Sequence, residues 1–296
     1  MSDDADGSIE AFDLLSNEVR LDILRTLGEA MAGDDELPLT FTELQRRVGV
    51  EDNGRFNYHL SELTGQLVAK REGGYELKPP GTHIYQAIVS GLYTDDRGTD
   101  PVPVEGEHCP YCGAEAAAWY DDSRFHLGCS ACDNLVIRYI IPPASFDRDD
   151  PESLLRAGGA YILRDQVSTR QGICPYCAGQ IERELIEEGG EIEEFNERVY
   201  SAVAKFVCER CGWSMHSGVP FAMNTEPAVI GFFEDHGEAI FERHPWSIYQ
   251  YAEDEVLDRD PWRVEVRCRI DGDVLRLVVD DDVRVVETEL LAAPQR

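Results

Sequence analysis

Apolar residues recur at helical spacing over the first third of the chain. One stripe, which Ser16 is predicted to cap, consists of Val19, Ile23, Leu27 and Met31. Thr40 and Glu43 have the spacing of a capping box, and they predict a second, short helix that ends at Gly49. Two amphipathic helices are therefore expected before residue 50.

A third helix is predicted over residues 54–64, with Asp52 or Asn53 as its N-cap. Its buried stripe consists of Phe56, Leu60 and Leu63. After it, the pattern predicts a β-hairpin over residues 67–77, with a glycine pair at the turn, and a last amphipathic helix over residues 81–93.

Near the C-terminus the spacing of apolar residues changes from the helical period to a period of two, which is typical of β-strands. From Trp262 to Glu289 apolar and polar residues alternate, and turn signals at 271–272 and 280–282 predict a three-stranded meander. One face of its first strand is expected to be apolar (Val264, Val266, Cys268 and Ile270) and the other charged (Arg263, Glu265, Arg267 and Arg269). Between these regions, helices are predicted over residues 151–171 and 227–236.

Eight of the nine cysteines fall into four Cys-x-x-Cys pairs, which form two sets. The first set is Cys109, Cys112, Cys129 and Cys132, and the second is Cys174, Cys177, Cys208 and Cys211. Each Cys-x-x-Cys turn directs two thiolates at one point, and two such turns complete a tetrahedron around zinc. The spacings resemble those of zinc ribbons, and the residue after each second cysteine is small or turn-forming. The sequence therefore predicts two zinc ions, one in each set.

These sites are expected to be structural, because four thiolates leave a zinc ion no open position for a substrate. Nearby histidines are expected to be bystanders: His108, His126 and His216. Iron stays open as the metal, since four thiolates also suit iron–sulfur sites. A redox role would need a βαβ context that the pattern lacks. The ninth cysteine, Cys268, is predicted to be a small core residue.

The formal net charge is −31, and only three of the 27 basic residues are lysine. This balance resembles that of proteins from salt-loving archaea, in which an acidic surface is a solvation adaptation; an acidic partner-binding face is the alternative. It argues against a nucleic-acid partner, which favours positive charge. Residues 41–80 are the exception, because six basic residues there balance six acidic ones.

Four segments of the N-terminal third carry a resemblance to a known family. In chain order they are LLSNEVRLDILRTL, TELQRRVGV, GRFNYHLSEL and VAKREGGYEL. They resemble the ArsR-type winged helix-turn-helix of haloarchaeal transcriptional regulators, over about residues 11–93. The resemblance implies that the third helix enters the major groove of double-stranded DNA and that the hairpin, or wing, touches the backbone. The residues it would place against DNA are Asn53, Arg55, Asn57, Tyr58 and Ser61 on the helix and Arg71 on the wing.

The chemistry of these side chains agrees with that role, since Asn57 can pair with adenine and Arg55 with guanine or phosphate. His59 is expected to pack at the edge of the core. The family also implies a homodimer formed through the last helix. Metal sensing by this domain is not expected, because no cysteine precedes Cys109 and the last helix carries a single histidine, His83.

Together these elements predict an α+β chain with a winged helix-turn-helix, two zinc-ribbon-like β-modules, connecting helices and a C-terminal three-stranded antiparallel meander. The expected segments are a disordered tail (1–10), the winged helix-turn-helix (11–93), a linker (94–107), zinc ribbon 1 (108–145), a connecting helix (146–172), zinc ribbon 2 (173–222), and a helix with the meander (223–296).

The expected function is sequence-specific DNA binding by a transcriptional regulator whose C-terminal region dimerises, binds a protein partner or senses a signal. The alternative is a zinc-ribbon adaptor that docks on transcription machinery through aromatics such as Trp119, Tyr120 and Trp213, although module core is the favoured role for each. An enzyme is not expected, because the chain has no HExxH, phosphate-loop, GxSxG or dinucleotide motif. No apolar run approaches the about 20 residues that a bilayer span needs, and no export signal is present, so a cytoplasmic protein without membrane contact is expected.

Overall fold

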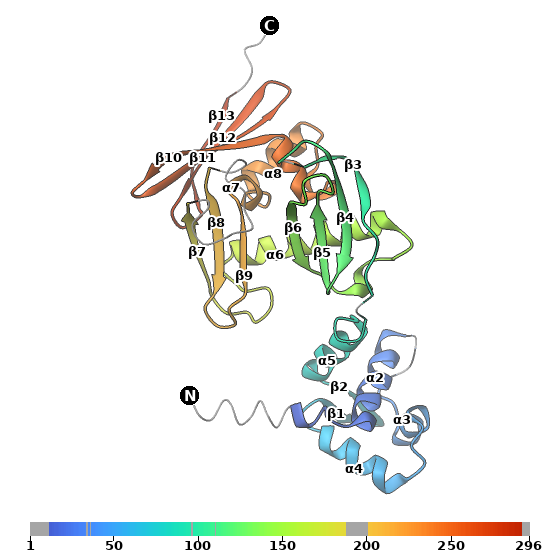
Figure 1. Ribbon diagram of the computed structural model, residues 1–296. Helices are drawn as coiled ribbons and strands as arrows, with labels where there is room; N and C mark the ends of the chain where they lie inside the picture. The colour runs from blue at the N-terminus through green and yellow to red at the C-terminus, as the bar shows by residue number, and fades with distance from the viewer. Residues whose placement is uncertain are drawn as a thin grey trace. The chain divides into compact units, whose positions relative to one another are not determined.

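The computed structural model describes residues 12–33, 35, 37–95, 97–109, 111–187 and 201–291. It is a mixed α+β chain in which helices precede several small antiparallel sheets (Figure 1). Two compact units are present, Met1–Asp96 with Pro142–Ala144, and Arg97–Ile141 with Ser145–Arg296. The predicted tail, residues 1–10, lies outside the described residues. Among the described helices, none is both long and apolar enough to cross a membrane.

The described residues of the first unit form four longer helices and one hairpin. They are α2 (Glu18–Ala32), α3 (Phe41–Val48), α4 (Asn53–Leu63), β1 (Val68–Arg71), β2 (Gly74–Leu77) and α5 (Pro79–Val89). The predicted apolar stripe of α4 is buried, and it packs with α2 and α3 residues such as Ile23, Leu27 and Leu44 in one hydrophobic cluster. The order of elements and the hairpin agree with the prediction from the apolar pattern.

Details of the first and last helices of this unit differ from the prediction. Asn17, not Ser16, caps α2, because its side chain accepts a hydrogen bond from the Val19 amide while the Ser16 hydroxyl bonds to the Asp13 carbonyl. Met31 is 41% exposed. The i+4 spacing drifts about 40° per step around a helix of 3.6 residues per turn, so the last member of the stripe has rotated out of the core. α5 begins at Pro79, two residues early, because proline is well suited to the first turn.

The described part of the second unit has three antiparallel sheets. The first contains β3 (Val102–His108), β4 (Glu115–Asp121), β5 (Arg124–Gly128) and β6 (Leu135–Ile140), and the second β7 (Ile181–Ile186), β8 (Val203–Cys208) and β9 (Ser214–Gly218). The third contains β10 (Ala252–Arg259), β11 (Trp262–Ile270), β12 (Asp273–Asp280) and β13 (Val285–Leu291). Residues 102–107, which the sequence places in a linker, thus begin the first sheet, where Val102 pairs with Ala118.

Helices fill the space between these sheets. They are α6 (Pro151–Arg170), α7 (Val219–Ala222) and α8 (Pro227–Asp235), with short 3-10 turns at Ile240–Glu242 and Pro245–Gln250. A further 3-10 turn, Pro143–Ser145, includes two residues of the first unit. Figure 1 shows α6 between β9 and β6, from where it continues behind the β3–β6 sheet. One hydrophobic cluster includes residues of α6 and of all three sheets, such as Leu154, Tyr120, Phe206 and Val264. The second unit therefore has a single core.

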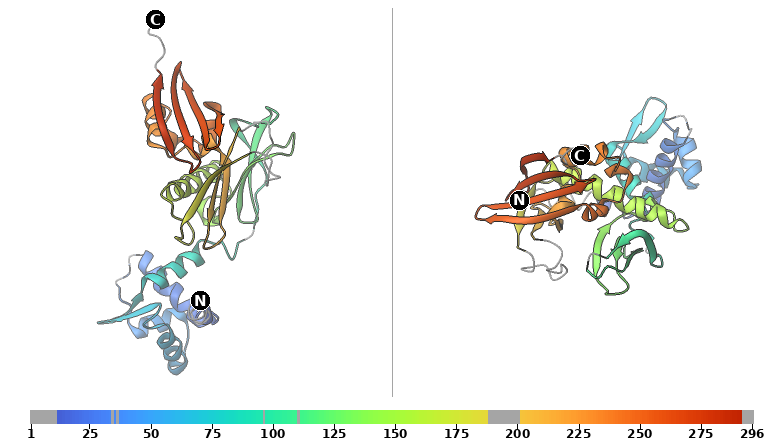
Figure 2. Two further views of the ribbon diagram at one scale, coloured as in Figure 1. Left: turned by 90° about the vertical axis from the view of Figure 1, so that its left-hand side faces the viewer. Right: turned by 90° about the horizontal axis from the view of Figure 1, so that it is seen from above.

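The C-terminal meander has four strands, whereas the sequence predicts three; they lie side by side in Figure 2. The extra strand, β10, was missed because the acidic run Glu253–Glu255 conceals its period of two. The predicted apolar face of β11 is buried, but Glu265 on the predicted charged face is only 4% exposed. It is buried because Arg267 beside it and Arg276 of β12 pair with its carboxylate. Charge pairing thus covers a position that alternation alone assigns to solvent.

Candidate metal centres and nucleic-acid interface

The eight paired cysteines gather into the two predicted groups. In each group the four sulfur atoms lie within 4.8 Å of one another, although they come from turns far apart in the chain. In the first, the Sγ atoms of Cys109 and Cys132 are 3.6 Å apart and those of Cys112 and Cys129 are 3.5 Å apart. In the second, the corresponding distances are 3.8 Å for Cys174–Cys211 and 3.4 Å for Cys177–Cys208.

These distances fit ligands of one tetrahedral ion. A Zn–S bond of about 2.3 Å places the sulfurs of a tetrahedron about 3.8 Å apart, whereas a disulfide brings them to about 2.05 Å. All nine cysteines are free. The donor set therefore fits a metal ion at each site, and such an ion would fasten together two turns that the chain separates by sixteen or thirty residues.

Local backbone geometry explains how each turn directs its thiols. The residue after each second cysteine has a positive φ, and these residues are Gly113 (76°), Asp133 (56°), Ala178 (56°) and Gly212 (73°). In three of the turns its amide donates to the carbonyl of the first cysteine, as from Gly113 to Cys109 at 2.9 Å. This left-handed residue turns the backbone around the sulfurs, which is why small or turn-forming residues occupy all four positions.

The surroundings of the first cluster shift the pKa values of two of its thiols in opposite directions. Burial raises the pKa of the Cys109 thiol to about 12. A hydrogen bond from the Asn134 side chain, 3.2 Å from the Cys132 sulfur, lowers the pKa of Cys132 to about 6. Buried thiols of this kind ionise together only beside a cation, as metal binding requires. Asn134 was missed by the sequence analysis, and its place two residues after the last cysteine of the set is the signal that could have found it.

The second cluster has a cradle that only glycine fits. A Cβ atom at Gly179 would lie 3.0 Å from the sulfur of Cys208 and 3.2 Å from that of Cys177. The Gly179 amide instead donates to the Cys177 sulfur at 3.4 Å. Amide donors of this kind stabilise thiolate ligands from outside the coordination shell.

Histidines and the ninth cysteine stay outside both clusters among the described residues. His126 stacks on Trp119 with ring centroids 5.1 Å apart, and Cys268 is fully buried on β11, as predicted for a core residue. Tyr120 is also fully buried, while Trp119 and Trp213 are half-buried. The aromatics of the two modules therefore serve mainly as core, with one exposed neighbour, Tyr176, beside Trp213 at 5.8 Å.

The residues predicted to face DNA are exposed on α4 and β1. On α4 they are Asn53, Arg55, Asn57, Tyr58 and Ser61, opposite a buried face that includes Phe56 and Leu60. Arg55 has no acidic partner among the described side chains. Arg71 lies on β1, where Glu76 of β2 pairs with it at 2.6 Å. His59 is 8% exposed and burial lowers its pKa, in agreement with a place at the core edge.

Acidic residues pair with Arg46 and Arg47 of the neighbouring helix α3. Arg47 pairs with both Asp35 and Glu43 at 2.6 Å, and Arg46 pairs with Glu43 at 2.8 Å. Hydrogen bonds from these two arginines lower the pKa of Glu43 to about 2. Some of the opposite charges that balance in the sequence of this region therefore also form direct ion pairs in the structure.

A protein-family model described as "Domain of unknown function (DUF7351)" matches residues 106–285, which contain both cysteine clusters. The chain belongs to this family. A second model, "Domain of unknown function (DUF7347)", matches residues 8–88, the range that contains α2 to β2 and most of α5. No curated protein and no solved structure matches the chain.

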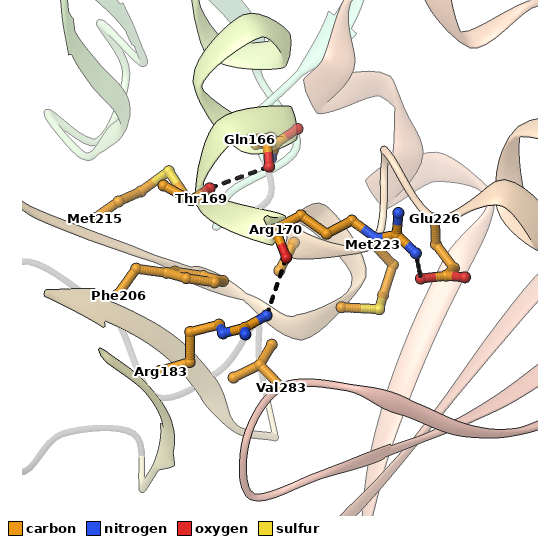
Figure 3. Close-up of a pocket in the computed structure, with 10 residues that line it drawn as sticks. Gln166, Thr169, Arg170, Arg183, Phe206, Met215, Met223, Glu226 and Val283 are labelled. Carbon is orange, nitrogen blue, oxygen red and sulfur yellow. Dashed lines mark hydrogen bonds and ion pairs between the residues drawn. The ribbon is translucent and has the colours of Figure 1, made fainter. Parts of the chain in front are cut away.

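The DUF7351 region also contains a small internal cavity of about 20 Å³ at the end of α6 (Figure 3). Arg170 closes one side through an ion pair with Glu226 at 2.8 Å, and Arg183 donates to the Arg170 carbonyl at 3.1 Å. The buried side-chain amide oxygen of Gln166, Oε1, has no hydrogen-bond partner among the described residues. A cavity of this size holds about one water molecule, which such an oxygen would bind.

Proposed function

We propose that this DUF7351 chain is a sequence-specific DNA-binding transcriptional regulator. In this proposal the first unit is an ArsR-type winged helix-turn-helix, α4 is the recognition helix and the β1–β2 hairpin is the wing. The exposed face of α4 lies against the major groove, and Arg71 contacts the backbone. As in that family, the chain works as a homodimer on two half-sites in the cytoplasm.

One observation carries the proposal. α4 buries its apolar residues in the core of its own unit, and its outward face has side chains whose chemistry suits base reading, including Arg55, which has no acidic partner among the described residues. In this chain of net charge −31, Arg55 differs from the nearby Arg46 and Arg47, which are both paired with carboxylates. A recognition helix needs such a face, because asparagine and arginine read base edges through paired hydrogen bonds.

The paired cations predict how this binding depends on salt. Phosphate contacts release condensed counterions, so each one makes affinity fall as salt rises. Carboxylates already compensate Arg46, Arg47 and Arg71, and their contribution to phosphate binding is small. Binding therefore depends mainly on base-edge contacts, which specify sequence and persist in concentrated KCl.

In the same proposal each cysteine cluster holds one structural zinc ion. The sulfur distances favour a single tetrahedral ion over a multi-iron cluster, in which the cysteines bind separate irons and lie farther apart. Four thiolates leave no site for a substrate, so the role of the second unit is dimerisation, partner binding or sensing rather than catalysis.

The test is DNA binding by the full zinc-loaded chain in high KCl. Randomised duplexes are selected, and the best sequence is titrated against wild type and the double variant R55A/N57A. We expect the variant to lose about tenfold or more in affinity for the selected sequence, since each base contact contributes about 1–3 kcal/mol. R25A, which removes an exposed arginine of α2, is the control and keeps wild-type affinity. Sequence-specific binding that survives R55A/N57A contradicts the recognition-helix assignment.

A second candidate function is a zinc-ribbon adaptor that contacts a protein of the transcription machinery without reading DNA. The exposed side chains at the end of α6 and at the second cluster favour it: Val167 (48%), Ile173 (49%) and Tyr176 (46%). Failure of the wild-type chain to select any duplex sequence, together with copurification of a transcription protein that Y176A no longer binds, would support this candidate instead.

A further inference from the structure

Gln45 of α3 forms hydrogen bonds with the loop before α4, the proposed recognition helix, and with the first residue of that helix. Its amide nitrogen donates to the Val50 carbonyl at 2.9 Å and to the Asn53 side-chain oxygen at 2.7 Å. Gln45 is half-buried, whereas Asn53 is exposed at the start of α4. Both protons of one glutamine amide are therefore used to fix the loop before α4 and the first side chain of that helix.

This bond determines which end of the Asn53 amide is free. The oxygen already accepts from Gln45, while the amide nitrogen has no partner among the described residues. A free NH₂ group donates hydrogen bonds, so it suits guanine, whose O6 and N7 are both acceptors. Adenine pairing would require the base's amino group to share the oxygen that Gln45 already occupies.

We propose that Gln45 is a positioning residue that holds Asn53 as a hydrogen-bond donor, so that Asn53 selects guanine at the base pair it meets. Asn57, one turn further along α4, has no such restraint and is the asparagine that pairs with adenine. This inference rests on the proposed DNA-binding function. It assigns different bases to two asparagines that the sequence alone treats alike.

Two substitutions reverse the hydrogen-bonding groups without removing the side chains. Gln45→Glu replaces the donor by a carboxylate, which repels the Asn53 oxygen and attracts its NH₂ group, so the amide turns and its oxygen faces the DNA. Asn53→Asp keeps an acceptor for Gln45 but leaves only acceptor oxygens outward. In both variants the outward group accepts hydrogen bonds, and bases with an exposed amino group, adenine or cytosine, become favoured.

The experiment selects randomised duplexes with the full zinc-loaded chain in high KCl and compares base preference at each position. We expect Q45E and N53D to lose guanine preference by about tenfold at one and the same base pair. They keep the adenine preference that N57A removes at another base pair. R25A, which removes one positive charge from an exposed position of α2, changes the net charge by the same amount as either variant, and as the control it changes neither preference.

The outcomes separate this inference from the function on which it rests. A uniform loss of affinity in Q45E, with guanine preference unchanged, shows that Gln45 only supports the fold and overturns the inference while DNA reading stands. Guanine preference that persists in N53D overturns it as well. If the wild-type chain selects no sequence, the DNA-binding function and the inference both fail.

Discussion

Single residues with unusual backbone or charge determine much of the local structure. Asp133 and Ala178 adopt φ values of 56°, a left-handed conformation that costs a non-glycine residue about 1–2 kcal/mol. They keep it because the adjacent thiols must converge on one point. Asp254 shows a comparable conflict in its charge, since burial raises the pKa of its carboxyl to about 6 although the Ser201 amide donates to it at 3.0 Å.

The raised pKa of Asp254 predicts that this residue destabilises the folded chain at neutral pH more than at acidic pH. Its folded-state pKa lies above the ordinary value of 3.8, so the stabilising effect of the protonated acid is complete below about pH 4 and is lost as pH rises through 6. Above pH 7 we expect D254N to unfold at a higher urea concentration than wild type. Its free energy of unfolding should exceed that of wild type by at most about 3 kcal/mol. The advantage shrinks toward pH 5, measured by urea titration. An advantage that is the same at pH 5 and pH 8 contradicts this explanation.

At the scale of elements, close packing explains a sequence feature that local propensity disfavours. The Gly158-Gly159 pair weakens α6 as an isolated helix. A Cβ atom at Gly158 would lie 2.8 Å from the ring of Phe125 on β5, so glycine allows the helix to approach the first sheet. Gly231 of α8 differs, because a Cβ atom there meets nothing within 4 Å.

Substitution of these two glycines by alanine should therefore have opposite effects. We expect G158A to destabilise the chain by about 1–2 kcal/mol, since the overlap with Phe125 outweighs the gain in helix propensity. G231A is the matched control and should stabilise it by roughly 0.5–1 kcal/mol. Thermal unfolding in high KCl measures both. A G158A chain that is more stable than wild type would show that α6 can move away from β5 at little cost.

At the scale of the whole molecule, the described residues form two separate hydrophobic cores. The helical unit has its own hydrophobic cluster, while one cluster joins both cysteine modules to α6 and the C-terminal sheet. The proposed zinc ions fasten the turns at two sites on this shared core. Its stability is therefore expected to depend on both ions together, and salt is expected to screen the repulsion among its acidic residues.

Loss of either ion should affect the whole second unit and spare the first. Metal analysis of wild type is expected to return two zinc ions per chain. C129S and C174S should each lower amide-exchange protection in both β4 and β8, while protection of α2 and α4 remains. C268A, which removes the buried ninth cysteine, should retain two zinc ions. A variant that keeps one ion and full protection of the other module contradicts a shared core.

Local patterns predicted much of the fold. The stripe of Phe56, Leu60 and Leu63 predicted α4, because a helix needs only neighbours in sequence to define its buried face. The spacing of the cysteines predicted both clusters, because a Cys-x-x-Cys turn brings two sulfurs together locally. The sequence missed β10, the burial of Glu265 and the capping by Asn17, since each depends on partners that a local pattern does not reveal.

The sequence by itself determined most element types, the two groups of four cysteines and the exposed face of α4. Only the tertiary structure decided which distant groups meet. It brought Asn134 to the Cys132 sulfur, Phe125 to Gly158, and Gln45 to Asn53. The physical reason is range: helical and strand periods follow from backbone geometry within a few residues, whereas a hydrogen bond or packing contact between elements exists only once the chain has folded.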